Sequence, residues 1–208
     1  MLYTFDEITS TQDKLKDFFR EGTADFGDFV LAKKQTKGRG RLGRSFFSPP
    51  KTGIYLSVLL PYEDTQMLTI RAGVAVLESI EQATGIKTNI KWVNDLYLNG
   101  KKIAGILAEA ITDKEGVLSA VILGVGINVS YPAEDFPQDI KETAGVLFPE
   151  NSVKKQSEKE ISSLIENITK ELIERLSAIP KQAGDKSFIT SYKSHLINPE
   201  DVPEGILE

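Results

Sequence analysis

The chain has 208 residues, of which 40% are hydrophobic and 26% are charged, and it contains no cysteine. This composition describes an ordinary globular protein of one domain with a sizeable core, and it excludes disulfides, thiolate catalysis and cysteine-ligated metal sites. The net charge of −5 argues against a nucleic-acid-binding surface, and no apolar run is long enough for a signal peptide or a membrane span. We therefore expect a cytoplasmic protein without nucleic-acid or membrane partners.

Two helices and two strands are predicted in the first part of the chain. A helical face of Leu15, Phe18 and Phe19 follows the capping residues Ser10 and Thr11. The β-branched and aromatic run TGIYLSVLLP is typical of a strand. The predicted elements are a helix over 10–22, a strand over 28–35, a strand over 52–61 and a helix over 65–85.

The second part of the chain continues with strands and ends with helices. Asn99–Gly100 is the strongest turn signal and predicts a hairpin between two strands. The nearly continuous apolar run over 117–130 predicts a buried strand, and apolar residues at helical spacing predict a long helix over 158–179. A shorter helix is expected over 187–196. Together these elements predict an α+β fold, a mixed β-sheet flanked by helices.

The segment from Lys33 to Arg44 carries six basic residues and no acidic one. Its glycines alternate with arginines in GRGRLGR, residues 38–44. Glycine lets backbone N–H groups approach an anion, and arginine presents a fork of donors that matches phosphate or carboxylate. The loop lies between two predicted strands, so a rigid scaffold displays it. These features favour an anion-binding loop; a solvated basic turn and a nucleic-acid contact are the open alternatives.

Two further stretches combine polar residues with buried strands. KWVNDLYLNGKKIAGIL places Asn94 and Asp95 at the end of a strand, and it places Lys102 before an apolar run, where its ammonium can reach a partly buried anion. LGVGINVS has Gly124 and Gly126 within a buried strand, which indicates close approach to the backbone. The alternatives are an ordinary polar turn, a solvated lysine and a β-bulge.

Together and in this order, the motifs resemble those of the biotin protein ligases, also called biotin–[acetyl-CoA-carboxylase] ligases. The joint pattern GRGRxGR, KWxNDLY, KxAGIL and GxGIN is highly specific, and KETAGVL is a weaker echo. The resemblance spans residues 1–196 and implies the catalytic-domain fold of that family, which is similar to class II aminoacyl-tRNA synthetases. It also implies that residues 197–208 begin a missing or truncated SH3-like C-terminal domain.

The resemblance implies an ATP-dependent ligase. Such an enzyme forms biotinyl-5′-AMP from biotin and ATP, with Mg²⁺ held mainly by the ATP phosphates. It then transfers biotin to one lysine of a biotin carboxyl carrier domain. Two anions meet in the first step, so charge neutralisation and alignment matter more than acid–base chemistry. The family also allows a homodimer through sheet edges.

The resemblance assigns roles to the matching positions. Lys102 bridges the biotin carboxylate and the α-phosphate, and Arg39 and Asp95 complete the expected catalytic set. The expected biotin-binding residues are Ser10, Thr11, Gln35, Gly38, Arg39, Arg41, Lys102, Gly105 and Gly124. The expected ATP- or adenylate-binding residues are Arg39, Arg41, Arg44, Asn94, Lys102 and Asn128. The basic loop is expected to be mobile without ligand and to close over the adenylate, which shields it from water.

The sequence departs from the family pattern at Val93, where relatives have proline; valine is expected to keep an extended backbone there. No helix-turn-helix segment precedes Ser10, so no repressor function is expected. Two other functions stay open. One is a lipoate ligase or octanoyl transferase of the same superfamily, and the other is a biotin-binding module without ligase turnover.

Overall fold

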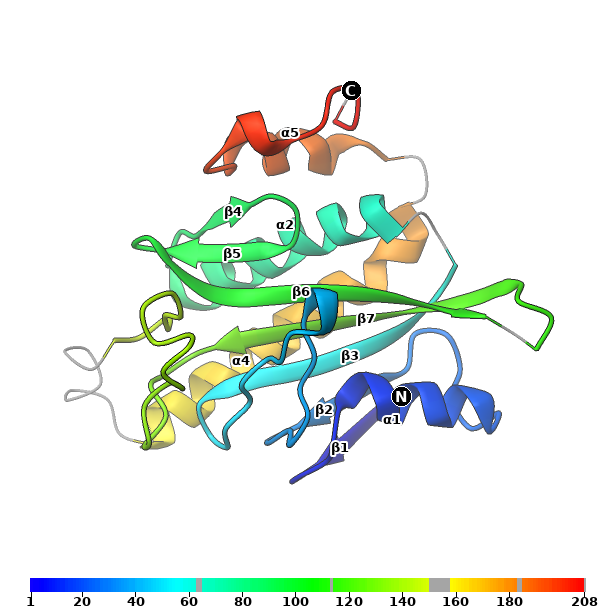
Figure 1. The fold of residues 1–208 in the computed structure, drawn as a ribbon, viewed down its shortest axis with the longest axis horizontal. Coiled ribbons are helices and arrows are strands. Elements are labelled where there is room, and N and C mark those ends of the chain that lie inside the picture. The colour runs from blue at the N-terminus through cyan, green and yellow to red at the C-terminus, as the bar shows by residue number, and fades with distance from the viewer. Residues whose placement is uncertain (63–64, 113, 150–157, 183–184, 208) are drawn as a thin grey trace.

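A seven-stranded mixed sheet forms the centre of the molecule (Figure 1). The computed structural model describes residues 1–62, 65–112, 114–149, 158–182 and 185–207. The strands are β1 (Leu2–Phe5), β2 (Phe29–Ala32), β3 (Gly53–Pro61), β4 (Asn89–Lys91), β5 (Asp95–Leu98), β6 (Lys101–Thr112) and β7 (Leu118–Asn128). They lie in the order β1-β2-β3-β7-β6-β5-β4, with β1 and β2 parallel and the other neighbours antiparallel. The predicted α+β fold is confirmed.

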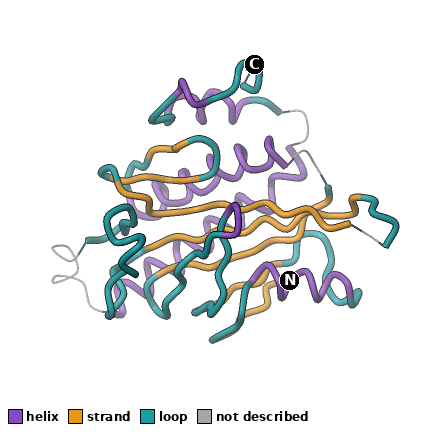
Figure 2. The backbone as a smooth tube through the Cα atoms, viewed as in Figure 1, coloured by secondary structure: helices purple, strands orange, loops and turns teal. Residues whose placement is uncertain are grey.

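Helices cover the two faces of this sheet unequally. α2 (Thr65–Thr84) and α4 (Glu158–Ala178) pack together behind the sheet, and α5 (Ser187–Ser194) packs on α2 (Figures 1 and 2). α1 (Thr11–Arg20) lies on the other face against β2, β3 and β7. The short 3₁₀ helices are η1 (Arg41–Gly43), η2 (Ile179–Gln182) and η3 (Pro199–Asp201). None of the described helices is both long enough and apolar enough to cross a membrane.

The strands and helices match the predictions in kind and order, with two strands added. The turn at Asn99–Gly100 is confirmed, since both residues have positive φ, 50° and 77°, and Leu98 pairs with Lys101 across it. One added strand is β4, which pairs with β5 before the predicted hairpin. The other is β1, a strand of four residues. Its partner is the distant strand β2, so β1 depends on a pairing that no local pattern in LYTF indicates.

Residues 92–94 form a turn between β4 and β5, and the extended backbone expected at Val93 stays a prediction. The Trp92–Val93 peptide bond is cis. The Tyr192 hydroxyl donates a hydrogen bond of 3.0 Å to the Val93 carbonyl oxygen, and the rings of Trp92 and Tyr192 meet edge to face. α5 therefore holds this turn, which leads directly into β5.

The C-terminal residues pack on the same core as the rest of the chain. The Ile90 N–H of β4 donates to the His195 carbonyl oxygen over 2.8 Å, and the Ile197 N–H donates to the Ile90 carbonyl oxygen over 2.9 Å. Leu207 is 7% exposed and belongs to the main hydrophobic core. The described residues beyond 196 thus continue the domain, while the start of a further domain over 197–208 stays a prediction.

Candidate active site

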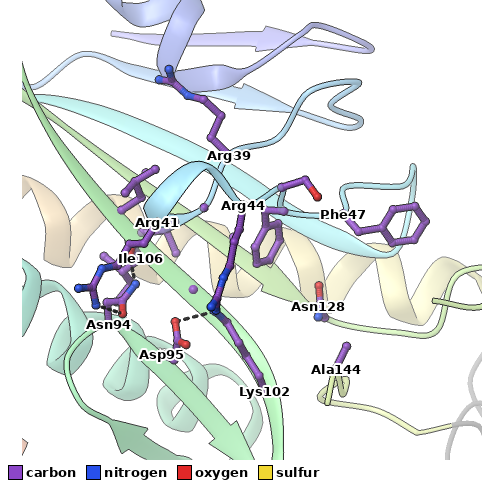
Figure 3. A pocket seen from close by; sticks show the side chains of 18 of the residues that line it. Arg39, Arg41, Arg44, Phe47, Asn94, Asp95, Lys102, Ile106, Asn128 and Ala144 are labelled. Atoms are coloured by element: carbon purple, nitrogen blue, oxygen red, sulfur yellow. Dashed lines mark hydrogen bonds and ion pairs between the residues drawn. The ribbon is translucent and has the colours of Figure 1, made fainter. Parts of the chain in front are cut away.

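A pocket of about 490 Å³ opens on the sheet face opposite α2 and α4 (Figure 3). Its walls are the start of α1, the basic loop between β2 and β3, the β4–β5 turn, and strands β6 and β7. The segment 136–144 closes the remaining side. The main core occupies the opposite face, so this face is free to bind a ligand.

Three glycines line the pocket along β6 and β7. Gly105 on β6 pairs with Gly126 on β7, and Gly124 lies two residues away on the same face. An added Cβ would lie 2.5 Å from Phe46 Cε1 at Gly126 and 2.8 Å from Gln12 Cδ at Gly124. Glycine is required here because the side chains of Phe46 and Gln12 lie directly against the backbone. A flat ligand group that displaced these side chains would lie against the same backbone.

Polar side chains meet at the α1 end of the pocket. Gln35 Oε1 accepts hydrogen bonds from the Thr11 backbone N–H over 2.8 Å and from Thr11 Oγ1 over 3.1 Å. Gln35 Nε2 donates to Ser48 Oγ over 2.9 Å, and Gln12 Nε2 donates to the Leu107 carbonyl oxygen over 3.2 Å. A ligand with fixed donors and acceptors can exchange for these bonds, which is how polar groups in a pocket give selectivity.

Ser10 and Gly38 lie beneath the pocket and are not among its lining residues. Ser10 is 1% exposed and caps α1 by accepting a hydrogen bond from the Asp13 N–H at 3.4 Å. Gly38 is buried where an added Cβ would collide with the Phe46 carbonyl oxygen. In this structure Ser10 caps α1 and Gly38 lets the loop backbone lie close to the Phe46 carbonyl oxygen, and the expected contacts of both residues with biotin stay predictions.

Positive charge dominates the other end of the pocket. The cations that line it are Arg39, Arg41, Arg44, Lys91 and Lys102. Among the described lining residues the one carboxylate is Asp95, whose Oδ1 lies 2.6 Å from Lys102 Nζ. The Arg44 side chain extends toward this pair (Figure 3), and its guanidinium forms no hydrogen bond or ion pair with another described residue. Such an excess of positive charge suits an anionic ligand.

Arg39 differs from the other two arginines of the loop. Its guanidinium points away from Lys102 and Asp95 (Figure 3). Nη1 pairs with Asp13 Oδ1 at 2.9 Å, and Nη2 pairs with Glu109 Oε2. Two carboxylates thus face this side chain in the structure, and the expectation that it neutralises the biotin carboxylate and the phosphates stays a prediction.

The two asparagines expected at the adenylate have partners within the protein. Asn94 is 8% exposed; its Nδ2 donates to the Ile106 carbonyl oxygen over 2.7 Å, and its Oδ1 accepts from Arg41 over 3.0 Å. Asn128 Nδ2 donates to the Gly145 carbonyl oxygen over 3.0 Å. Asn94 therefore fixes the direction of Arg41, and Asn128 is held at the pocket wall.

The backbone of Lys102 is held from outside its own hairpin. Its N–H donates to the Thr143 carbonyl oxygen, and its carbonyl oxygen accepts from the Gly145 N–H, both over 2.8 Å. Because Gly145 also accepts the hydrogen bond from Asn128, one short segment positions two pocket residues. This segment belongs to the KETAGVL motif.

Two buried tyrosines support the site from below. Burial raises the pKa of the Tyr192 phenol, and the negative charge of Asp95 raises it further. Burial also raises the pKa of Tyr55, although a hydrogen bond with Thr52 partly offsets this rise. Both phenols therefore stay protonated at neutral pH; Tyr55 donates to the Pro49 carbonyl oxygen over 2.8 Å, just after the basic loop.

Comparison with known proteins gives the family. Residues 4–128 match the Biotin/lipoate A/B protein ligase family. The chain belongs to this family. The bifunctional ligase/repressor BirA of Bacillus spizizenii is 45% identical over 146 residues, which cover 68% of this chain and 44% of that protein. The biotin–[acetyl-CoA-carboxylase] ligase of Mycobacterium tuberculosis is 32% identical over 169 residues, which cover 76% of this chain and 59% of that protein. The chain thus spans about half the length of these curated relatives.

A solved structure of this family agrees with the fold. Biotin protein ligase from Aquifex aeolicus in complex with biotin and ATP superimposes with a TM-score of 0.74 at 33% identity. The alignment covers 94% of this chain and 78% of that one. The resemblance to biotin protein ligases, read from the motifs, is confirmed.

Several pocket residues of this family member were not predicted as ligand contacts. Gln12 covers Gly124, and Phe46 covers Gly126. Their signals were present, because Gln12 directly follows Thr11, Gly126 lies within GxGIN, and the first aromatic residue after GRGRLGR is Phe46. Ala144 lies within the weaker echo KETAGVL, whereas Phe136 had no comparable signal, since a long connection after β7 brings it to the pocket.

The described residues offer no metal centre. They contain no group of three or more His, Asp or Glu side chains that could hold a metal ion. In the described pocket the single carboxylate, Asp95, is already paired with Lys102. A divalent cation at this site would therefore need most of its ligands from a bound phosphate compound and water.

Proposed function

We propose that this chain is the catalytic domain of a biotin protein ligase, which forms biotinyl-5′-AMP and then transfers biotin to a carrier lysine. The observation that carries the proposal is the division of one pocket into an amide-lined end and a cationic end, joined by a floor with glycines. Relatives named as biotin ligases, and the Aquifex aeolicus structure with biotin and ATP, support these substrates.

The amide-lined end suits the ureido ring of biotin. Thr11, Gln12 and Gln35 present donors and acceptors at fixed positions. The acyl chain then runs along Gly124 and Gly126, where backbone is accessible once the covering side chains move. Its carboxylate reaches the cationic end, where ATP binds.

The first step joins two anions. A biotin carboxylate oxygen attacks the α-phosphorus of ATP; the new O–P bond forms, the bond to the bridging oxygen breaks, and pyrophosphate leaves. Lys102 neutralises the carboxylate and the α-phosphate, and Arg41 and Arg44 add positive charge from the loop. Mg²⁺ enters with the ATP phosphates and supplies further neutralisation when bound.

The second step consumes the mixed anhydride. The neutral amine of the acceptor lysine attacks the acyl carbon; a C–N bond forms, the C–O bond to AMP breaks, and the amine loses one proton to solvent. Asp95 lies beside Lys102, so it orients that ammonium and is the carboxylate nearest to the incoming amine. The acceptor is a biotin carboxyl carrier domain; a cytoplasmic location and a homodimer complete the proposal.

The test is direct. The purified chain is mixed with ATP, Mg²⁺ and either biotin or lipoate, the acyl-AMP is sought by mass spectrometry, and a biotin carrier domain is added afterwards. Biotinyl-AMP followed by a mass gain on the carrier supports the full proposal. Lipoyl-AMP in its place would move the chain to the lipoate branch of the family. Tight biotin binding without any adenylate would reduce it to a binding module.

A further inference from the structure

We propose that Arg39 is a positioning residue that clasps the basic loop to the body of the protein, and that it does not bind the substrate anions with its side chain. This proposal adds to the ligase function proposed above. Its consequences for adenylate retention rest on that function. The clasp has three members, Arg39, Asp13 and Glu109. They are hereafter called the Arg39 clasp.

Charge compensation separates Arg39 from its neighbours. Two carboxylates face its one guanidinium, so the local charge of the clasp is negative. Arg41 is paired with the neutral amide of Asn94, and Arg44 has no partner among the described residues. An anionic substrate is therefore attracted by Arg41 and Arg44 and repelled from the clasp.

The burial of the clasp makes its ion pairs effective. The side chain of Arg39 is 32% exposed, and those of Asp13 and Glu109 are 42% and 35% exposed. These values lie well below those of an exposed pair such as Lys33 with Asp6, at 64% and 88%. The two guanidinium nitrogens each take a different carboxylate, a geometry that lysine cannot reproduce.

The clasp joins the loop to both halves of the pocket. Asp13 lies in the first turn of α1, directly after Gln12, which covers the glycine floor. Glu109 lies on β6, the strand that also carries Lys102 and Gly105. The Arg39 side chain thus connects the loop to α1, at the amide-lined end of the pocket, and to β6, which carries Lys102 at the cationic end.

Backbone pairing within the loop links the position of Arg39 to the positions of Arg44 and Phe46. Within the loop, the Gly40 N–H donates to the Arg44 carbonyl oxygen over 2.8 Å, and Arg39 bridges Ser45 as in an antiparallel pair. Ser45 is followed by Phe46, whose ring covers Gly126. Holding Arg39 therefore lowers Phe46 onto the floor and places Arg44 over the cationic end.

The test removes the two sides of the Arg39 clasp separately. The double variant Asp13→Asn with Glu109→Gln keeps the shapes and removes both charges, and Arg39→Gln removes the other side. The matched control, Asp17→Asn with Glu174→Gln, removes two negative charges at exposed positions outside the pocket. All variants are checked for equal folding by circular dichroism before comparison.

Two quantities are measured: the rate of protease cleavage of the loop without any ligand, and the rate at which biotinyl-AMP is released. Chymotrypsin cleavage after Leu42, Phe46 and Phe47 reports loop opening in the free chain, and the rate of biotinyl-AMP release reports retention. If the Arg39 clasp holds the loop, chymotrypsin cleaves the Asp13→Asn, Glu109→Gln variant and the Arg39→Gln variant faster than the parent. Both variants also release adenylate about tenfold faster, as expected for the loss of two partly buried ion pairs. The control variant behaves as the parent does in both measurements.

The opposite result would identify Arg39 as a substrate ligand. In that case the freed guanidinium of the Asp13→Asn, Glu109→Gln variant retains adenylate as well as the parent or better, while Arg39→Gln alone loses it; unchanged cleavage would also overturn the clasp. If the parent chain forms no biotinyl-AMP, the ligase proposal fails, and the cleavage readout still judges the clasp by itself.

Discussion

The ammonium of Lys102 faces the one carboxylate of the described pocket, yet the surroundings of this ion pair are cationic. Asp95 therefore orients Lys102 without cancelling the positive field of Arg41, Arg44 and Lys91. An arriving carboxylate and an α-phosphate can both approach the ammonium, because it has three donor directions and Asp95 uses only one. These side chains therefore suit electrostatic stabilisation of the reacting anions more than acid–base catalysis.

Replacement of Lys102 tests this role. Lys102→Ala should lower the rate of biotinyl-AMP formation by about 10²- to 10³-fold, the range found when one preorganised charge-stabilising group is removed. The rate is measured as pyrophosphate release under saturating biotin and ATP. Lys101→Ala is the matched control, since this neighbouring lysine does not line the pocket. A Lys102→Ala variant with near-normal rate would remove Lys102 from the mechanism.

The glycine floor gives a second prediction at the same scale. Gly126→Ala places a Cβ 2.5 Å from the Phe46 ring, the far end of a side chain that can move away. We expect weaker biotin binding, by about tenfold, because the added methyl group occupies the floor along which the acyl chain is proposed to lie, with little change in the free energy of unfolding. Isothermal titration calorimetry and urea unfolding measure the two quantities.

The control for this variant is Gly73→Ala in α2, which does not line the pocket and where the nearest atom to a new Cβ, on Tyr192, is 3.4 Å away, an ordinary contact distance. Alanine is the better helix former, so this change should leave biotin binding as it is. Equal loss of binding in both variants would contradict the role given to the floor.

At the scale of elements, the segment 143–145 acts as an extra strand beside the start of β6. It pairs with Lys102 through backbone atoms alone, so its sequence is restricted by space and not by side-chain chemistry. An added Cβ on Gly145 would lie 2.6 Å from Lys101 Cβ, an atom that cannot move without the backbone. Glycine is therefore needed for the segment to approach β6.

Gly145→Ala should separate the segment from β6. We expect a loss of about 1–3 kcal/mol in the free energy of unfolding, as for overpacking, together with slower adenylate formation because Lys102 loses its support. A second change, Lys101→Gly, removes the opposing Cβ and should restore part of both quantities in the double variant. Absence of any rescue would show that the close approach is not the cause.

Several strands and turns could be predicted from local sequence patterns, whereas contacts between distant elements could not. The apolar run of β7 and the Asn99–Gly100 turn follow from local rules, and GRGRLGR placed the basic loop between β2 and β3. The direction of the Arg39 side chain does not follow from the motif, because its carboxylate partners come from α1 and β6. Ser10 shows a related limit: helix capping, which the structure confirms, and biotin binding, which stays a prediction, call for the same residue type.

At the scale of the whole molecule, one core supports the site. Helices α2, α4 and α5 lie on one face of the sheet (Figure 1), and the pocket lies on the other. The C-terminal residues take part, because Ile197 extends the edge at β4 and Leu207 is buried in the same core. Truncation or mutation of this segment should therefore affect the fold before it affects the chemistry.

Leu207→Ala tests the unity of the core. The side chain is 7% exposed, so its truncation should lower the free energy of unfolding by about 2–5 kcal/mol, measured by urea denaturation. Glu204→Ala, an exposed change in the same segment, should have little effect. If both variants unfold at the parent's urea concentration, the residues after 196 are an appendage and not part of this domain.

The outermost point of the basic loop has a practical use. Leu42 is 88% exposed and has a φ of 56°, so it stands clear of the loop contacts beneath it. Since the chain has no cysteine, Leu42→Cys would create a unique thiol there. A fluorophore on that thiol would turn the loop into an optical reporter, with which opening and closing could be followed in real time as each substrate is added.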